Sequence, residues 1–228
     1  MCYKIEILKM YKLDNRKNIF LSILIILALI FIGAGLYLQN SPRTLYPGEI
    51  LEYEGQDLSS INDFRENSIQ GPQEINVSSY RLTITGLVNE TKEYTYEVIL
   101  NSFQKYRKVT TLHCIEGWSV KILWEGFMLE EILDTARVQP ESVIVIFRAY
   151  DGYSTSLPLE YIENENILLA YKMNDIVLPP ERGFPFQLVA ESKYGYKWIK
   201  WITEIELSAD TDYRGYWESR GYSNDASI

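Results

Sequence analysis

The longest hydrophobic run in the chain covers residues 19–38, IFLSILIILALIFIGAGLYL, and contains no charged side chain. At 1.5 Å per residue, a helix of this length spans roughly 30 Å, the thickness of the hydrocarbon core of a bilayer. A buried core helix is the alternative, but such helices seldom run this far without a polar face. The pattern predicts a transmembrane helix over 19–38. A retained anchor is favoured over a cleaved signal, because Gly33-Ala34-Gly35 is a poor cleavage site.

After this run the pattern changes to that of a folded domain. Residues 39–59 are polar and predict a linker, and residues 60–228 predict one domain. Apolar positions at helical spacing predict two short helices, at 94–103 and 128–138. Alternating or continuous β-rich stretches predict strands within 80–88, 108–126, 142–159, 167–190 and 198–210. Because strands outnumber scattered helices, we expect an α+β fold with mixed, mainly antiparallel sheets.

Charge divides the chain at the hydrophobic run. The formal net charge is −9 and the pI is about 4.8, which argues against a nucleic-acid partner. Five basic and two acidic residues precede the run, whereas 17 basic and 29 acidic residues follow it. The positive-inside rule therefore predicts a single-pass cell-membrane protein with residues 1–18 in the cytoplasm and the domain outside it.

The chain has two cysteines, Cys2 and Cys114, and one histidine, His113. These counts exclude a disulfide scaffold, a multi-cysteine zinc site, a bis-histidine haem and a cysteine-ligated cluster. A lone cysteine in an apolar strand is most often a small buried hydrophobe. Cys114 also directly precedes a predicted turn at Glu116-Gly117, where a thiolate at a cleft edge suits a soft metal. His113 points to the opposite face of an extended strand and is a poor general base for it.

Several strings, in order and at matching spacing, closely resemble the molybdopterin-binding domain of the sulfite oxidase family. They are LHCIEGWSVKILWEGFMLEEIL, DGYSTSLPLE, LAYKMNDIVLPPERGFPFQLV, KYGYKWIKWITEIEL and GYWESRGY. The resemblance covers roughly residues 60–222. It implies that domain's fold, an oxidoreductase activity and one molybdenum-molybdopterin cofactor per chain. It also implies that Cys114 is the only protein ligand of the metal.

The resemblance implies a set of cofactor-binding positions as well. They are Arg65, Asn67, Ser68, Ala149, Arg182, Gln187, Lys197, Trp198, Ile199 and Lys200. A pterin with a phosphate needs cations and fixed polar partners. Several positions depart from the family pattern: Arg65 lies one place off the family Arg and Arg182 stands at the site of a His or Asn. In addition, Ser68 replaces a His, Ala149 a Thr and Gln187 an Arg. The last change removes a cation, which Arg182 is expected to supply instead.

Two absences bear on the reaction. Sulfite oxidases carry an Arg shortly after the ligand cysteine, where this chain has Glu116 and Trp118. These two residues and Cys114 are the candidate catalytic residues, and the carboxylate disfavours a dianionic substrate. The C-x-E-x-W-S form is similar to the bacterial reductase branch, whose best-known member reduces methionine sulfoxide in exported proteins. Without haem or cluster ligands, the chain must receive electrons from a separate redox partner, expected to be membrane-bound.

The sequence therefore supports three hypotheses. The leading one is a membrane-anchored molybdenum oxidoreductase that reduces a neutral S-oxide or N-oxide. The second keeps the cofactor but oxidises sulfite. The third is an extracytoplasmic binding module that has lost the cofactor. The residues at 187 and 149 make this third hypothesis conceivable, whereas Cys114, Lys197 and Lys200 argue against it.

Overall fold

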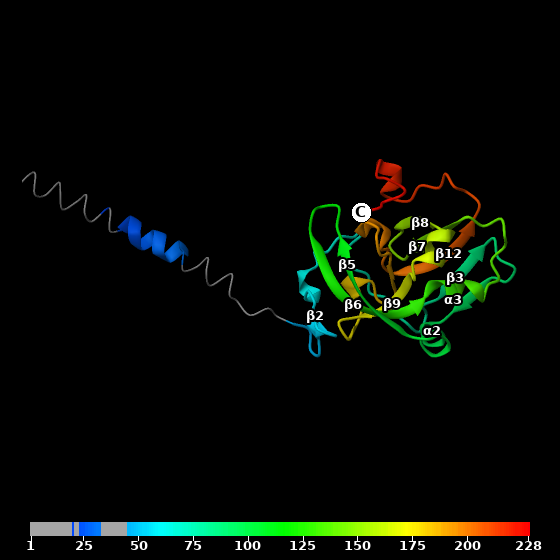
Figure 1. Cartoon of the computed structure of the whole chain (residues 1–228), viewed down its shortest axis with the longest axis horizontal. Coiled ribbons are helices and arrows are strands. Elements are labelled where there is room, and N and C mark those ends of the chain that lie inside the picture. The colour runs from blue at the N-terminus through cyan, green and yellow to red at the C-terminus, as the bar shows by residue number, and fades with distance from the viewer. Residues whose placement is uncertain (1–19, 21–22, 33–44) are drawn as a thin grey trace, which may run out of the picture. The chain divides into compact units, whose positions relative to one another are not determined.

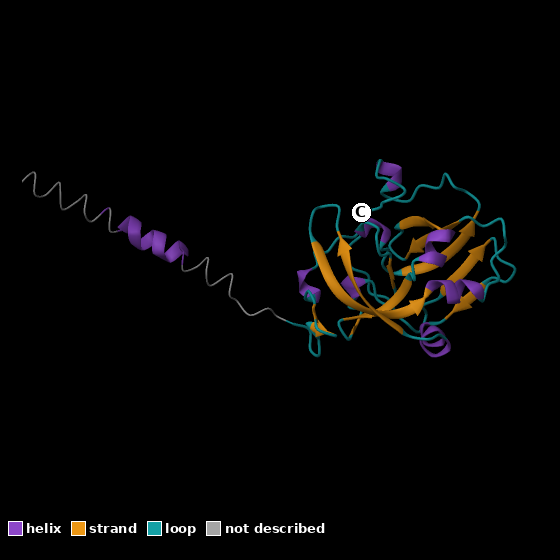
Figure 2. Ribbon diagram, in the orientation of Figure 1, coloured by secondary structure: helices purple, strands orange, loops and turns teal. Residues whose placement is uncertain are grey.

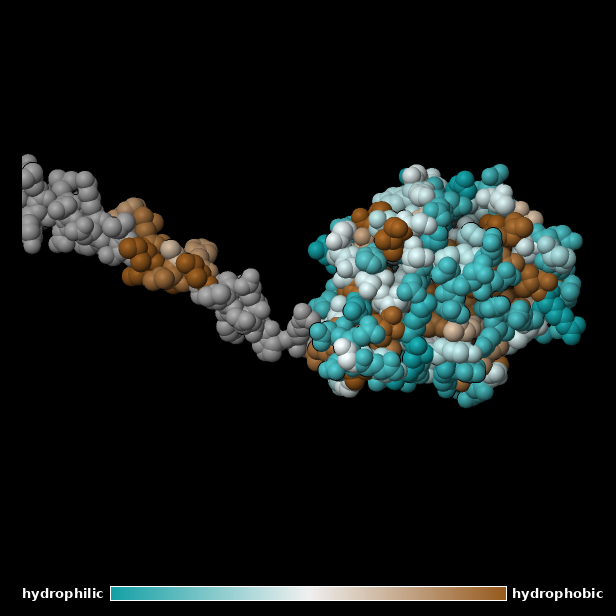
Figure 3. Space-filling view, in the orientation of Figure 1, coloured by the Kyte–Doolittle hydropathy of each residue, from teal (hydrophilic) through white to brown (hydrophobic). Residues whose placement is uncertain are grey.

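The computed structural model describes residues 20, 23–32 and 45–228, which fall into two units divided after Thr44. Residues 23–32 are helical, and their side chains are apolar and exposed (Figure 3). No helix among the described residues has the length and hydrophobicity needed to cross a membrane. The predicted cytoplasmic segment 1–18 and positions 19, 21–22 and 33–38 of the predicted transmembrane helix lie outside the described residues.

The first of two five-stranded sheets in the Leu45–Ile228 unit has the order β10-β9-β6-β5, and β11 also pairs with β9 (Figures 1 and 2). All of these pairings are antiparallel. The long central strand β6 approaches β9 closely at Gly126, where an added Cβ would lie 2.4 Å from the Leu169 carbonyl oxygen. The strands are β5 (Tyr106–His113), β6 (Ser119–Met128), β9 (Leu168–Met173), β10 (Ile176–Val177) and β11 (Gln187–Val189).

The second sheet has the order β4-β3-β12-β7-β8. Its centre is β12, the last strand in the sequence, which pairs parallel with β3 and antiparallel with β7. Because this is the one parallel pair between strands in the described chain, the expected mixed, mainly antiparallel sheets are confirmed. The strands are β3 (Leu82–Gly86), β4 (Lys92–Tyr94), β7 (Ile144–Ala149), β8 (Ser154–Pro158) and β12 (Ile202–Ser208).

Short helices cover parts of the sheets. The two predicted α-helices are confirmed as α2 (Tyr96–Ser102) and α3 (Leu129–Asp134). A third, α4 (Leu159–Asn164), has no counterpart among the predictions, because it buries only Ile162 completely and its sequence carries little periodicity. The 3-10 helices are η1 (Ile61–Asp63), η2 (Pro180–Arg182), η3 (Gly195–Lys197) and η4 (Glu218–Arg220).

Residues 45–59, which the sequence pattern assigns to a linker, pack on the domain in the structure. They contain the small hairpin of β1 (Glu52–Tyr53) and β2 (Gln56–Asp57). The Ser59 amide donates to the Lys121 carbonyl at 2.8 Å, and Leu58 is buried. Backbone hydrogen bonds of this kind leave no hydrophobic period in the sequence, so the pattern of side chains does not reveal them.

One hydrophobic core joins the two sheets. Its largest fully buried side chains include Trp124 and Phe127 of β6, Phe147 of β7, Phe186 and Trp201. Burying each side chain of this size contributes about 1.5–3 kcal/mol to stability before the entropy cost of ordering it. The core fixes β6, β11 and the segment that leads into β12, and the functional side chains project from the ends of these elements.

Candidate active site

A cleft with a cavity volume of about 210 Å³ opens where segments distant in sequence meet. These segments are the loop 64–69, the hairpin loop 112–118, the turn at 151–153, the stretch 182–201 and the C-terminal segment 217–222. Only the tertiary structure brings them together, because they belong to both sheets and to both ends of the domain.

Cys114 stands at the end of β5, in the loop that joins β5 to β6. The loop is closed by backbone hydrogen bonds, from the Cys114 amide to the Trp118 carbonyl (2.9 Å) and from the Gly117 amide to the Cys114 carbonyl (3.0 Å). Gly117 has a φ of +88°, which favours glycine. The thiol is free and half-buried at the cleft. Burial raises the pKa of the Cys114 thiol, whereas the backbone N–H of Glu116 and the Arg65 guanidinium stabilise the thiolate.

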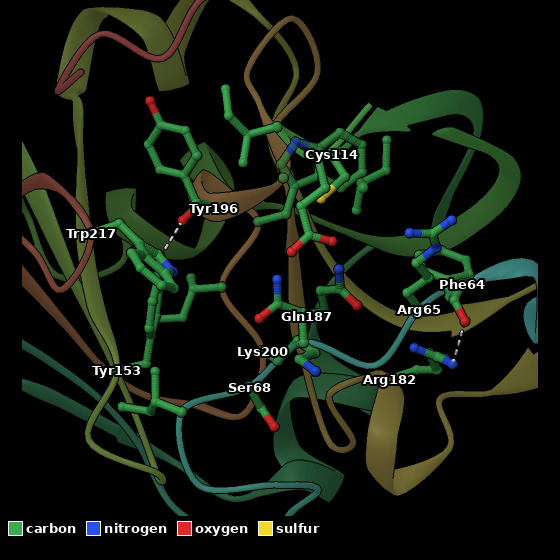
Figure 4. Close-up of a pocket in the computed structure, with 18 of the residues that line it drawn as sticks. Phe64, Arg65, Ser68, Cys114, Tyr153, Arg182, Gln187, Tyr196, Lys200 and Trp217 are labelled. Atoms are coloured by element: carbon green, nitrogen blue, oxygen red, sulfur yellow. Dashed lines mark hydrogen bonds between the residues drawn. The ribbon is translucent and has the colours of Figure 1, made fainter. Parts of the chain in front are cut away.

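One side of the cleft is cationic (Figure 4). The Arg182 guanidinium lies 5.0 Å from the centre of the Phe64 ring and donates to the Phe64 carbonyl at 3.3 Å. Arg65 follows Phe64 in the chain, and the Lys200 ammonium lies 3.1 Å from a carboxylate oxygen of Glu66. Burial lowers the pKa of both Arg182 and Lys200, and the Glu66 carboxylate opposes this change.

The opposite side of the cleft is aromatic. Figure 4 shows Tyr153, Tyr196 and Trp217 there, away from Phe64 and Arg182, with Gln187 and Lys200 between the two sides. The Tyr153 hydroxyl donates to the Tyr196 carbonyl at 2.6 Å. These rings offer a large apolar surface with few charges, which suits a neutral ligand.

Glu116 and Trp118 lie at the edge of the cleft beside the cysteine. The Trp118 indole N–H donates to the Glu116 carboxylate at 3.3 Å, and the Trp118 ring meets the Phe64 ring edge-on at 6.1 Å. Because backbone groups close the turn at Gly117, the exposed Glu116 carboxylate is not needed to cap it. The structure therefore presents a negative charge next to Cys114.

Most of the residues that sequence reasoning selected lie together in this cleft. Those that line it are Cys114, Glu116, Trp118, Arg65, Asn67, Ser68, Arg182, Gln187, Trp198, Ile199 and Lys200. Ala149 does not line it, because it lies within β7 in the hydrophobic core. Lys197 does not line it either, because its ammonium is fully buried and bonded to Glu218 Oε1 at 2.5 Å.

Sequence reasoning missed four aromatic residues of the cleft. Phe64, Tyr196, Trp217 and Tyr222 all line the cleft without having been selected. The signal that could have identified them is the concentration of aromatic residues in the KYGYKW and GYWESRGY strings. Their side chains contact one another across the fold, and periodicity along the chain does not encode such contacts.

The two sheets and the cleft with its free thiol are built from the strings that resemble the sulfite oxidase family, which assigns the domain to the sulfite oxidase type of oxidoreductase. The family model of the oxidoreductase molybdopterin binding domain matches residues 69–217, and the chain belongs to this family.

Individual relatives agree with this assignment. The chain is 33% identical over 147 residues to the uncharacterized oxidoreductase YuiH of Bacillus subtilis, covering 64% of this chain and 73% of that protein. It is 29% identical over 193 residues to the protein-methionine-sulfoxide reductase catalytic subunit MsrP of Gluconobacter oxydans, covering 75% of this chain and 62% of that protein. The chain thus spans about three fifths of that reductase subunit.

A solved structure shows the same fold. The sulfane dehydrogenase SoxCD from Paracoccus pantotrophus superposes with a TM-score of 0.59 at 24% identity, covering 61% of this chain and 41% of that chain. At this identity the likeness concerns the fold alone.

Proposed function

We propose that this chain binds one molybdenum-molybdopterin cofactor in the cleft and reduces a neutral S-oxide or N-oxide outside the cytoplasm. The observation that carries the proposal is the free Cys114 thiol at a cleft with cations on one side and aromatic rings on the other. The similarity to a protein-methionine-sulfoxide reductase catalytic subunit supports the reaction class.

The side chains around the cleft fit such a cofactor. Cys114 offers a soft sulfur donor. Because the described residues contain no group of three or more His, Cys, Asp or Glu able to hold a metal, the remaining ligands would come from the cofactor and solvent. The Nε of Arg182 is buried without a partner in the described chain, and with Lys200 it suits a phosphate or a pterin acceptor. Gln187 is only 3% exposed and adds an amide.

When bound, the cofactor supplies two-electron oxygen-atom transfer, and the chain's own residues hold it and choose the substrate. Cys114 would be the protein ligand of the metal, and its soft sulfur would tune the metal's reduction potential. Glu116 places a negative charge beside the cysteine, which disfavours an anion such as sulfite relative to a neutral oxide. Reducing an S-oxide to a sulfide and water consumes two electrons and two protons. A separate redox partner would deliver the electrons, and the term catalytic subunit for the relative MsrP is consistent with that arrangement.

The direction of the reaction provides the test of this proposal. With reduced and oxidised dyes, we expect kcat/KM for methionine sulfoxide, dimethyl sulfoxide or trimethylamine oxide to exceed kcat/KM for sulfite. Glu116→Arg should raise kcat/KM for sulfite by about tenfold, because a cation replaces the carboxylate beside Cys114. Glu116→Gln serves as the control that removes the charge without reversing it. A wild-type preference for sulfite over every oxide would establish the oxidase reaction instead.

The topology is a separate prediction. The basic flank before the 19–38 run favours a cytoplasmic N-terminus and an exported domain. A reporter that is active only outside the cytoplasm should work when fused after Ile228 and fail when fused before Ile19. The reverse pattern of reporter activity would refute the orientation, and activity of neither fusion would count against export of the domain.

A further inference from the structure

The C-terminal segment 215–228 forms part of the aromatic side of the cleft. Trp217 and Tyr222 both line the cleft, and they flank the single turn of η4. Their ring centres lie 5.1 Å apart, and the Tyr222 ring meets the Tyr196 ring at 5.5 Å. Tyr222 is 38% exposed, so this surface extends to the mouth of the cleft. The family model matches this chain only as far as residue 217, so most of the segment 215–228 lies outside the match.

Buried polar contacts hold the beginning of this segment. The Glu218 carboxylate is fully buried and accepts hydrogen bonds at one oxygen from the Lys197 ammonium (2.5 Å) and the Thr155 hydroxyl (2.6 Å). The Tyr216 amide donates to the Ser154 carbonyl at 2.9 Å. Trp217 therefore lies between two residues that are bonded to β8, which fixes its backbone position.

A second set of contacts holds the end of the segment. The Lys193 ammonium donates to the Asp225 carboxylate and to the Ser227 hydroxyl, at 2.9 Å in each case. The Tyr194 amide donates to the Ala226 carbonyl at 2.9 Å. With both ends bonded to the domain, the rings between them are positioned before any ligand binds, which lowers the entropy cost of binding.

We propose that Trp217 and Tyr222 select the substrate by binding the alkyl group beside its S-oxide or N-oxide, an inference that rests on the proposed function. Arg65 and Arg182 lie on the other side of the cleft and suit an anionic cofactor together with Lys200, which lies between the two sides. The aromatic side therefore remains for the neutral substrate. Aromatic faces bind methyl groups by apolar burial and bind thioether sulfur by additional weak contacts. Substrates with larger alkyl groups should therefore depend most strongly on this surface.

The test measures a series of sulfoxides with increasing alkyl size in the molybdenum-loaded full chain. Trp217→Ala should raise KM for methionine sulfoxide and methyl phenyl sulfoxide at least tenfold, a loss of about 1.4 kcal/mol, while kcat stays within about twofold. Tyr222→Ala should also raise KM, and Trp217→Phe should keep KM close to the wild-type value. Tyr150→Ala is the matched control, because Tyr150 is 60% exposed and does not line the cleft.

Two results would overturn this inference. One is an unchanged KM across the series in both alanine variants. The other is loss of molybdenum from Trp217→Ala, which would show that the surface holds the cofactor. If the wild type reduces no oxide at all, the proposed function fails, and calorimetric binding of alkyl sulfones then decides the inference. Binding at least tenfold weaker in Trp217→Ala than in the wild type supports it, and equal or absent binding in both proteins refutes it.

Discussion

Cys114→Ser is expected to lower oxide reductase activity by more than the roughly 10–100-fold that loss of an outer-shell partner of a metal site costs. The thiol is a free sulfur donor at the cleft, and a serine hydroxyl is a harder and much weaker donor for the metal. Steady-state kcat with a reduced dye, together with molybdenum content per chain, measures the effect. We expect about one molybdenum per wild-type chain and less in the variant.

The only other cysteine provides the matched control. Cys2 lies outside the described residues, and Cys2→Ser should leave both kcat and the molybdenum content unchanged. Wild-type protein from a molybdenum-replete host that contains neither the metal nor pterin fluorescence would contradict the proposed cofactor. Full activity in Cys114→Ser would contradict the role of the sulfur even if the cofactor is present.

Lys197→Ala should destabilise the domain by about 3–5 kcal/mol, because it leaves the fully buried Glu218 carboxylate without its cation. Glu218→Ala removes the other member of the pair. It leaves the Lys197 ammonium buried without its carboxylate and should lower the free energy of unfolding by a similar amount. Urea denaturation of the purified chain gives the change in the free energy of unfolding. The double variant Lys197→Met with Glu218→Leu should recover most of the loss, since apolar side chains of similar size can replace a buried ion pair.

A partly solvent-accessible ion pair of nearly the same length gives the control. The Lys92 ammonium nitrogen lies 2.6 Å from a carboxylate oxygen of Glu90 at the surface. Lys92→Ala should lower the free energy of unfolding by less than about 1 kcal/mol. If Lys197→Ala costs no more than Lys92→Ala but loses molybdenum, Lys197 contacts the cofactor as the family resemblance implies. If Lys197→Ala is strongly destabilised but the protein that stays folded retains molybdenum, the role of Lys197 is structural.

Much of the fold could be predicted from local pattern. Alternation of apolar and polar residues located the strands around Ile84 and Ile205, because a strand with one buried face repeats every two residues. A continuous run of β-branched and apolar residues located the strand around Phe147. Helical spacing located α2 and α3 for the equivalent reason. The helix α4 escaped, since it depends on backbone contacts with distant elements and on few buried side chains.

The sequence by itself determined the family, because the strings around Cys114 are contiguous motifs. It did not determine which side chains of a motif face the cleft. Lys197 and Lys200 lie three residues apart in one string, yet only Lys200 lines the cleft, whereas Lys197 turns inward to Glu218. A buried ammonium needs a compensating partner, and the Glu218 carboxylate that serves Lys197 comes from the C-terminal segment. The tertiary structure therefore decided which of the two lysines lines the cleft, and it placed Trp217 opposite the cationic side.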